Sequence, residues 1–293
     1  MSAPVRRLCT VFVTAGLVFG LLFVAPSAAV SATSLRYVAL GDSFASGPLI
    51  PHQRDNPVGC MRSDRNYPTL VANHLRVTEF VDVTCGGART ENMTQPQRLS
   101  FDSHRPQFDA LTEDTGLVTV TISGNDIGYV DILKTCGTKS LFDPKGNPCQ
   151  PHYTQHGTDE LRRRVNEANG KVEAVLRGIV DRAPRAAVVV VGYLRILPPR
   201  DGCWPVFPIA RGDVPYLVGV QDELNAMLGR RAKDIGATFV NPGATTGHDA
   251  CQVPKLKWIE GLIPTSPAAP VHPNAAGMRE VADRVLGALR RED

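Results

Sequence analysis

The sequence alternates short apolar runs, typical of buried strands, with longer stretches that carry apolar residues at helical spacing. This alternation favours βαβ units, in which helices cover both faces of a parallel sheet. We therefore expect an α/β fold, a three-layer α/β/α sandwich around a central parallel sheet. The expected strands are 36–40, 79–84, 117–122, 186–191 and 238–240.

Helices are expected between these strands. Apolar residues recur every three or four positions over 161–179, and Pro184 marks the end of that helix. Two other stretches, 136–157 and 194–212, are irregular and rich in Pro and Gly, so we expect loops there that carry function or a disulfide. The remaining expected helices are 67–75, 215–235 and 275–289.

Residues 1–32 have the pattern of a secretory signal peptide. Two arginines precede an apolar run over 11–25, and small residues follow it. Cleavage is expected after Ala29 or Ala32, and both satisfy the small-residue requirement. A retained membrane anchor is the alternative, but the run is short for the roughly twenty residues of a membrane span. We expect one domain over 33–293, secreted and either free or associated with the cell envelope.

The expected mature chain carries almost no net charge. Without Arg6 and Arg7, 30 basic residues stand against 29 acidic ones. This balance gives no footprint for nucleic acid, and we expect no nucleic-acid partner. The basic runs at 162–164 and 230–231 are interpreted as solvated helix faces.

Six cysteines follow the predicted leader, an even number that suggests three disulfides in an exported chain. Six cysteines allow fifteen pairings, and chain order and loop placement favour pairing between neighbours in sequence. No CxxC or HxxxH spacing accompanies them, so we expect no metal site. The favoured pairs are Cys60–Cys85, Cys136–Cys149 and Cys203–Cys251.

Candidate chemical groups follow the expected strands. Ligands of open α/β sheets bind outside the carboxyl ends of the strands, where this chain places Ser43, Gly87 and Asn125. Acyl transfer needs a hydroxyl activated by a base, together with donors for the developing oxyanion. The candidate base is His272, in a loop directly before the last helix.

Four short blocks, taken in order, resemble those of the SGNH, or GDSL, hydrolase family, and the closest likeness is to its secreted actinobacterial lipases and esterases. They span almost the whole expected mature chain. The resemblance implies a flavodoxin-like sandwich that hydrolyses carboxylic esters through an acyl-enzyme, without metal or organic cofactor. The blocks are Gly41-Asp42-Ser43, Gly87, Gly124-Asn125-Asp126 and His272-Pro273-Asn274.

The same resemblance implies roles for individual residues. Ser43 is the expected nucleophile and His272 the base that takes its proton. The expected oxyanion hole comprises the backbone N–H groups of Ser43 and Gly87 and the side-chain amide of Asn125. Removing one such donor typically costs about 3–4 kcal/mol of transition-state stabilisation.

The chain departs from the family pattern at the third triad position. Many members carry an aspartate three residues before the histidine, and Ala269 stands there. We expect a Ser–His dyad in which the Ala269 backbone carbonyl orients His272. A carboxylate from elsewhere is the alternative, with Asp249 the first candidate.

Other conspicuous residues have less specific interpretations. His248 pairs with Asp249 as a second acid–base pair or forms a loop hydrogen bond. Arg62 and Ser63 support a loop or point toward the site, and Asp126 is expected to cap the next helix. Four further residues line an acyl pocket or pack locally under a disulfide: Tyr129, Trp204, Phe207 and Ile209.

We therefore expect a secreted, monomeric serine esterase or lipase that acts on lipid or short-chain acyl esters. A carbohydrate O-acetyl esterase is the alternative within catalysis. From another class, the alternative is a catalytically silent cell-wall-binding protein on the same scaffold, and the intact Ser43, Asn125 and His272 argue against it.

Overall fold

A five-stranded parallel sheet forms the centre of the protein, as expected. The computed structural model describes residues 35–291, and the predicted leader lies outside this range. The expected strands are all present, with boundaries that differ by at most two residues. They are β1 (Arg36–Gly41), β4 (Glu79–Asp82), β7 (Thr115–Thr121), β8 (Ala187–Val191) and β9 (Thr238–Val240).

The strand order is β4-β1-β7-β8-β9. Numbered along the chain among these five strands alone, it reads 2-1-3-4-5, the flavodoxin-like order. The order reverses at β1, whose last residue Gly41 is in register with Thr121 at the end of β7. A ligand crevice is therefore expected where β1 and β7 end.

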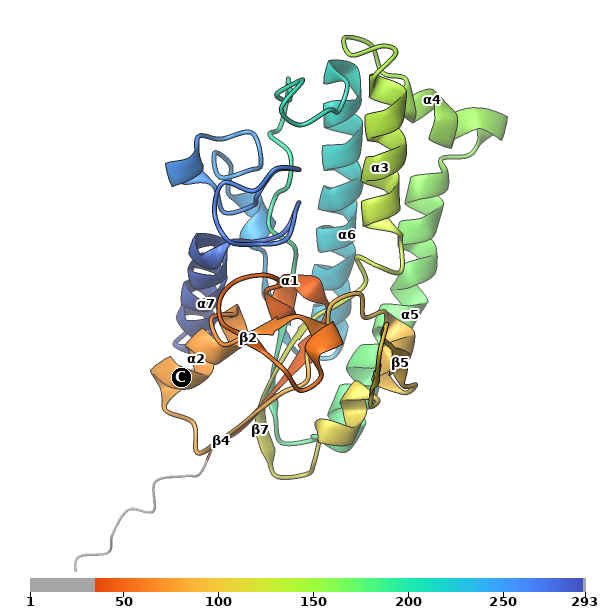
Figure 1. The fold of residues 1–293 in the computed structure, drawn as a ribbon. Helices are drawn as coiled ribbons and strands as arrows, with labels where there is room; N and C mark the ends of the chain where they lie inside the picture. Colours follow the sequence, from red (N-terminus) through yellow and green to blue (C-terminus); the bar gives the residue numbers. More distant parts are fainter. Residues whose placement is uncertain (1–34, 292–293) are drawn as a thin grey trace, which may run out of the picture. The chain divides into compact units, whose positions relative to one another are not determined.

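Two helical layers enclose the sheet. Figure 1 shows α2 (Tyr67–Leu75) and α7 (Ala275–Leu289) together on one side, where they pack against each other. On the other side α5 (Glu160–Arg182) packs against α6 (Val214–Asp234). Helix α3 (Tyr129–Ser140) runs beside α6 in the same view. The expected three-layer α/β/α sandwich is confirmed.

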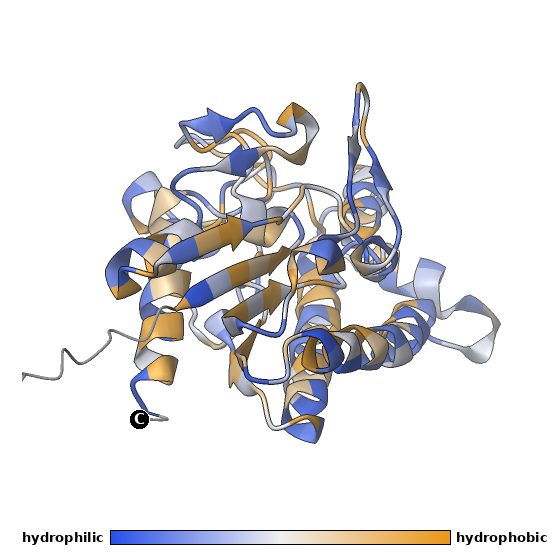
Figure 2. Ribbon diagram, turned by 90° about the horizontal axis from the view of Figure 1, so that it is seen from below, coloured by the Kyte–Doolittle hydropathy of each residue, from blue (hydrophilic) through white to orange (hydrophobic). Residues whose placement is uncertain are grey.

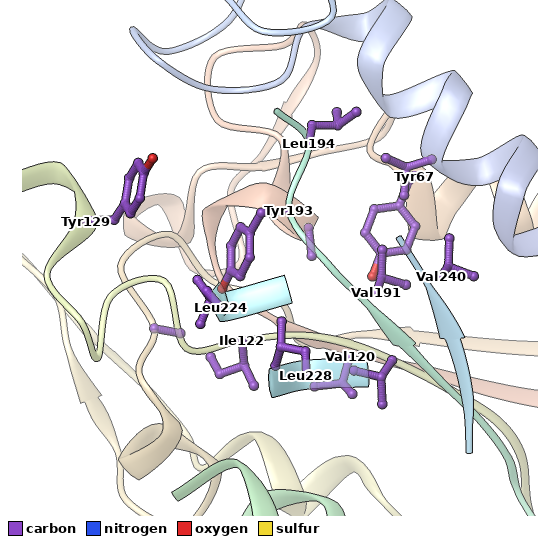
Figure 3. Close-up of a cluster of buried hydrophobic side chains, with 14 of the residues drawn as sticks. Tyr67, Val120, Ile122, Tyr129, Val191, Tyr193, Leu194, Leu224, Leu228 and Val240 are labelled. Atoms are coloured by element: carbon purple, nitrogen blue, oxygen red, sulfur yellow. The ribbon is translucent and has the colours of Figure 1, made fainter. Parts of the chain in front are cut away.

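The strands are apolar because both faces of the sheet are covered. Figure 2 shows hydrophobic residues along the strands and hydrophilic residues on the outer sides of the helices. Figure 3 shows part of the resulting core, in which sheet residues meet side chains of α2 and α6. Its labelled residues include Tyr67, Val120, Ile122, Val191, Leu224, Leu228 and Val240.

The loop expected over 136–157 is wrong in part. Helix α3 continues to Ser140, and α4 covers Cys149–Thr154. Ile132, Leu133 and Cys136 form the buried side of α3, but Gly, Pro and Ser around them obscured this short pattern. The stretch over 194–212 does lack regular structure until a 3₁₀ turn begins at Arg211.

Three disulfides fix loops of the protein, and the cysteines pair as expected. Their S–S bonds are Cys60–Cys85, Cys136–Cys149 and Cys203–Cys251. The first fixes the loop after β4, where Gly86 N–H also donates to the Cys60 carbonyl at 2.8 Å. The third ties the loop before α6 to the segment that leads to His272.

Candidate active site

Ser43 is raised from the sheet by a turn that needs glycine. Gly41 has φ +149°, and a Cβ there would lie 2.6 Å from the Thr121 carbonyl oxygen. Asp42 then caps the short helix α1 (Ser43–Ser46), and its Oδ1 accepts from Phe44 N–H at 2.9 Å. Ser43 is the first residue of α1, so its N–H has no acceptor within the helix and is free to bind an anion.

His272 lies directly against Ser43. The distance from its Nε2 to Ser43 Oγ is 2.9 Å, and the Phe44 ring lies beside the imidazole with centroids 5.4 Å apart. Burial lowers the pKa of His272 below its ordinary value of 6.5, and the hydrogen bond to the Pro270 carbonyl partly opposes this shift. The imidazole is therefore mainly neutral at pH 7 and able to accept a proton from Ser43.

The carbonyl that faces His272 Nδ1 belongs to Pro270, at 2.8 Å, and not to Ala269. The expectation for Ala269 is thus wrong by one residue. The Ala269 carbonyl instead accepts from the His272 backbone N–H at 3.2 Å. Val271, with φ +64°, turns the chain between them and directs the Pro270 carbonyl at the ring. A β-branched residue rarely adopts this conformation, so the turn could not be predicted from the residue types.

No described carboxylate is hydrogen-bonded to His272. The alternative candidate, Asp249, is buried, and its two oxygens accept from Cys251 N–H and the Gln252 side chain. His248 is likewise occupied, since its Nδ1 bonds the Leu256 carbonyl at 2.6 Å and its ring stacks on Trp258. The two residues stabilise their loop and do not form a second acid–base pair.

Asn125 comes to the same place from the end of β7. Ser123, with φ +102°, turns the chain there, and Asn125 lines one pocket with Ser43 and His272. One proton of the Asn125 amide goes to the Ala88 carbonyl at 2.9 Å. Within residues 35–291 the second amide proton has no acceptor.

Gly87 directly precedes Ala88, whose carbonyl accepts from the Asn125 amide. It has φ +78°, and within residues 35–291 its N–H makes no hydrogen bond to protein. Gln97 fixes the preceding residue by donating to the Gly86 carbonyl at 2.7 Å. The loop after β4 is therefore held against Asn125 with one backbone donor unused.

Tyr193 connects the Gly41-Asp42-Ser43 block to the Gly124-Asn125-Asp126 block. It was not among the residues expected from the sequence. Its hydroxyl donates to Asp42 Oδ2 and accepts from Gly124 N–H, both at 2.6 Å. Burial raises the pKa of Asp42 to about 7, while the bonds from Tyr193 and Phe44 act to lower it. Tyr193 lies two residues after the end of β8, and this position at the carboxyl end of a strand is the signal in the sequence that could have pointed to it.

Comparison with known proteins agrees with this geometry. The family model described as the GDSL-like lipase/acylhydrolase family matches residues 39–280. The chain belongs to this family. Lipase 2 of Streptomyces coelicolor is 38% identical over 262 residues, which cover 87% of this chain and 86% of the relative. As a GDSL-like hydrolase, the chain is a carboxylic ester hydrolase.

Two solved structures share the fold of this GDSL-like hydrolase. Phospholipase A1 from Streptomyces albidoflavus superposes with a TM-score of 0.69 at 28% identity, covering 89% of this chain and all of the other (100%). The extracellular lipase from Streptomyces rimosus gives a TM-score of 0.66 at 27% identity, covering 87% of this chain and 99% of the other.

The cleft of this GDSL-like hydrolase is mostly apolar. Beside Ser43, about 470 Å³ of empty space lies between α3 and α6. Tyr129 lines this space, and Phe207 and Ile209 line a second groove that also reaches His272. Trp204 lines neither of these two spaces. The apolar walls of the first space are Phe44, Tyr129, Val130, Leu133, Ile196, Leu224 and Val271.

Two remaining candidates have structural roles. Asp126 does not cap the next helix as expected, because its carboxylate accepts from the N–H and hydroxyl of Thr90, and the N-cap residue of α3 is Gly128, which has no side-chain cap. Arg62 is buried and supports the disulfide-bonded loop by donating to the Thr84 carbonyl at 2.8 Å. Neither residue lines the cleft of this GDSL-like hydrolase.

Over residues 35–291, no cluster of three or more His, Cys, Asp or Glu is placed to hold a metal ion. Within the same range, no helix has the length and apolarity required to cross a bilayer.

Proposed function

We propose that this protein is a secreted serine esterase that cleaves lipid-like acyl esters through a Ser43–His272 dyad. The supporting observation is the 2.9 Å contact between His272 Nε2 and Ser43 Oγ at an apolar cleft. The proposed orienter is the Pro270 carbonyl, which accepts from Nδ1–H and so leaves Nε2 unprotonated.

In the first half of the reaction, Ser43 Oγ attacks the ester carbonyl while His272 Nε2 takes its proton. The tetrahedral oxyanion accepts hydrogen bonds from the N–H groups of Ser43 and Gly87 and from the Asn125 amide. Collapse of this intermediate breaks the bond to the leaving alcohol, which receives the proton from His272. The acyl group remains on Ser43.

Water completes the cycle. It gives a proton to His272 Nε2 and attacks the acyl carbonyl of Ser43, and the same three donors hold the second oxyanion. The carboxylic acid leaves as Ser43 Oγ recovers its proton. Because a carbonyl stabilises the imidazolium less than a carboxylate does, the dyad depends strongly on the oxyanion donors.

Two sets of observations support the substrate class and the location. Apolar walls beside Ser43 favour an acyl chain, which must be removed from water to bind, and similar proteins are named lipase and phospholipase A1. The predicted leader, the three disulfides and the relative described as an extracellular lipase favour secretion. We expect a monomer.

A fluorophosphonate probe tests the nucleophile. The oxidised, folded protein should be labelled, whereas Ser43→Ala should not. A folded wild-type protein that is not labelled would favour a catalytically silent binding protein.

A panel of p-nitrophenyl esters of rising chain length, set beside an acetylated polysaccharide, tests the substrate class. We expect kcat/KM to rise beyond acetate. Negligible turnover beyond acetate, with preference for the polysaccharide, would overturn the lipid assignment in favour of O-deacetylation.

A further inference from the structure

Large apolar side chains are exposed on the segments that line the second groove. Three of them, Val130, Leu141 and Leu262, line the groove itself. Three others directly adjoin groove residues in sequence: Phe142 follows Leu141, Val206 precedes Phe207, and Ile263 follows Leu262. We call these six residues the apolar rim, and their exposed fractions lie between 44% and 87%.

The rim is drawn from three separate segments. Val130, Leu141 and Phe142 lie on α3 or directly after it, Val206 lies in the loop before α6, and the last pair precedes His272. Figure 1 shows the far end of α3 and the loop before α6 at the same end of the molecule. Convergence of three segments on one groove distinguishes the rim from isolated surface apolar residues, which are common.

The groove beneath the rim leads to the catalytic cleft. Its empty volume, including space open to solvent, is about 970 Å³, and it shares Val130, Leu133, Val271 and His272 with the space beside Ser43. An acyl chain that enters between the rim residues can therefore reach the dyad along apolar walls. A protein partner seated on the rim would instead cover His272 and block the substrate.

Charge near the groove is nearly balanced. Its only charged lining residue is Lys134, which pairs with Asp131 at 3.6 Å. The lining of the groove therefore lacks the concentrated positive charge with which proteins bind anionic membranes or nucleic acids. The free energy of docking through the rim comes from apolar surface that is removed from water. The partner must therefore be apolar beneath its surface.

We propose that the apolar rim docks the protein on the surface of zwitterionic or neutral lipid aggregates and delivers acyl chains to Ser43 through the groove. This inference rests on the proposed function, since the delivered ester is the substrate of the dyad. Phe142 and Ile263, the two most exposed members, contribute most of the contact.

Sedimentation with phosphatidylcholine vesicles tests docking apart from catalysis. The protein carries Ser43→Ala so that the lipid stays intact, and Phe142→Ser with Ile263→Ser is compared with the unmodified rim. We expect at least a tenfold loss of vesicle partitioning. The matched control is Phe101→Ser, because Phe101 is a fully exposed phenylalanine that lines neither groove, and it should partition as before.

In the active enzyme, turnover of soluble p-nitrophenyl acetate reports the dyad, while vesicle hydrolysis reports docking. The doubly substituted rim should lose at least tenfold on vesicles relative to the acetate ester. Equal partitioning of the rim and control variants would overturn the proposal, as would a concentration-dependent dimer that the rim substitutions abolish without any vesicle binding. Failure of the dyad would appear separately, as a wild-type protein that binds vesicles yet cleaves neither ester.

Discussion

The hydroxyl of Tyr193 donates to the Asp42 carboxylate at 2.6 Å and accepts from Gly124 N–H at the same distance. Asp42 precedes Ser43, and Gly124 precedes Asn125. One buried phenol thus fixes the turn that presents the proposed nucleophile relative to the turn that presents a proposed oxyanion donor.

Tyr193→Phe should lower kcat about tenfold or more with KM changed less than twofold. A hydrogen bond contributes roughly 0.5–1.5 kcal/mol between neutral groups and roughly 1.5–3 kcal/mol to a charged group, and Asp42, with its pKa raised to about 7, lies between these two cases. Loss of the bond loosens both turns without altering the acyl groove. Steady-state kinetics check this prediction, with Tyr216→Phe as the control. Tyr216 lies away from the site, and its hydroxyl donates to the Asp159 carboxylate at 2.9 Å. Equal kcat values in the two variants would assign Tyr193 a purely structural role.

Asn125→Ala should lower kcat by roughly 10²–10³ with little change in KM, because the amide acts on charge that develops in the transition state. The variant also loses the bond to the Ala88 carbonyl, so the loop needs its own control. Gln97→Ala releases the same loop at Gly86 without removing a proposed oxyanion donor. We expect it to retain much more activity, and comparable losses would mean that Asn125 acts only by holding the loop.

Asp249→Asn should leave kcat within a few-fold of wild type, whereas His272→Ala should lower it by several orders of magnitude. The Asp249 carboxylate accepts from Cys251 N–H and the Gln252 side chain, and the proposed orienter of the imidazole is the Pro270 carbonyl, 2.8 Å from Nδ1. Turnover and thermal unfolding are measured together, since Asp249 stabilises its loop. A folded Asp249→Asn protein as inactive as His272→Ala would restore a carboxylate-based triad.

The acid limb of kcat/KM should lie below pH 6.5. The reactive form of His272 is the neutral imidazole, and burial lowers its pKa below that ordinary value. Activity is therefore retained as the pH falls toward 6.5 and is lost only as the imidazole gains its proton at lower pH. A pH profile with a soluble short-chain ester measures this limb, and a midpoint above 6.5 would contradict the assignment.

Patterns that repeat along the chain were predictable, and local backbone turns were not. The five strands, the disulfide pairs and the positions of Ser43, Asn125 and His272 follow from hydrophobic periodicity, cysteine order and the four blocks. The Pro270 carbonyl depends on the left-handed conformation of Val271, which sequence preference opposes.

The contribution of Tyr193 was equally hidden. Its partners, Asp42 and Gly124, lie on two other strand ends, so the contact is a property of tertiary packing alone.

The use of the Pro270 carbonyl determines which mutations can remove the acceptor for His272. A triad aspartate can be lost through one side-chain substitution, but every residue placed at position 270 still supplies a peptide oxygen. The orienting group can be lost only if the path of the chain through Val271 changes. A single substitution at position 270 therefore leaves the acceptor for His272 in place. An insertion or deletion between Ala269 and His272 would remove it.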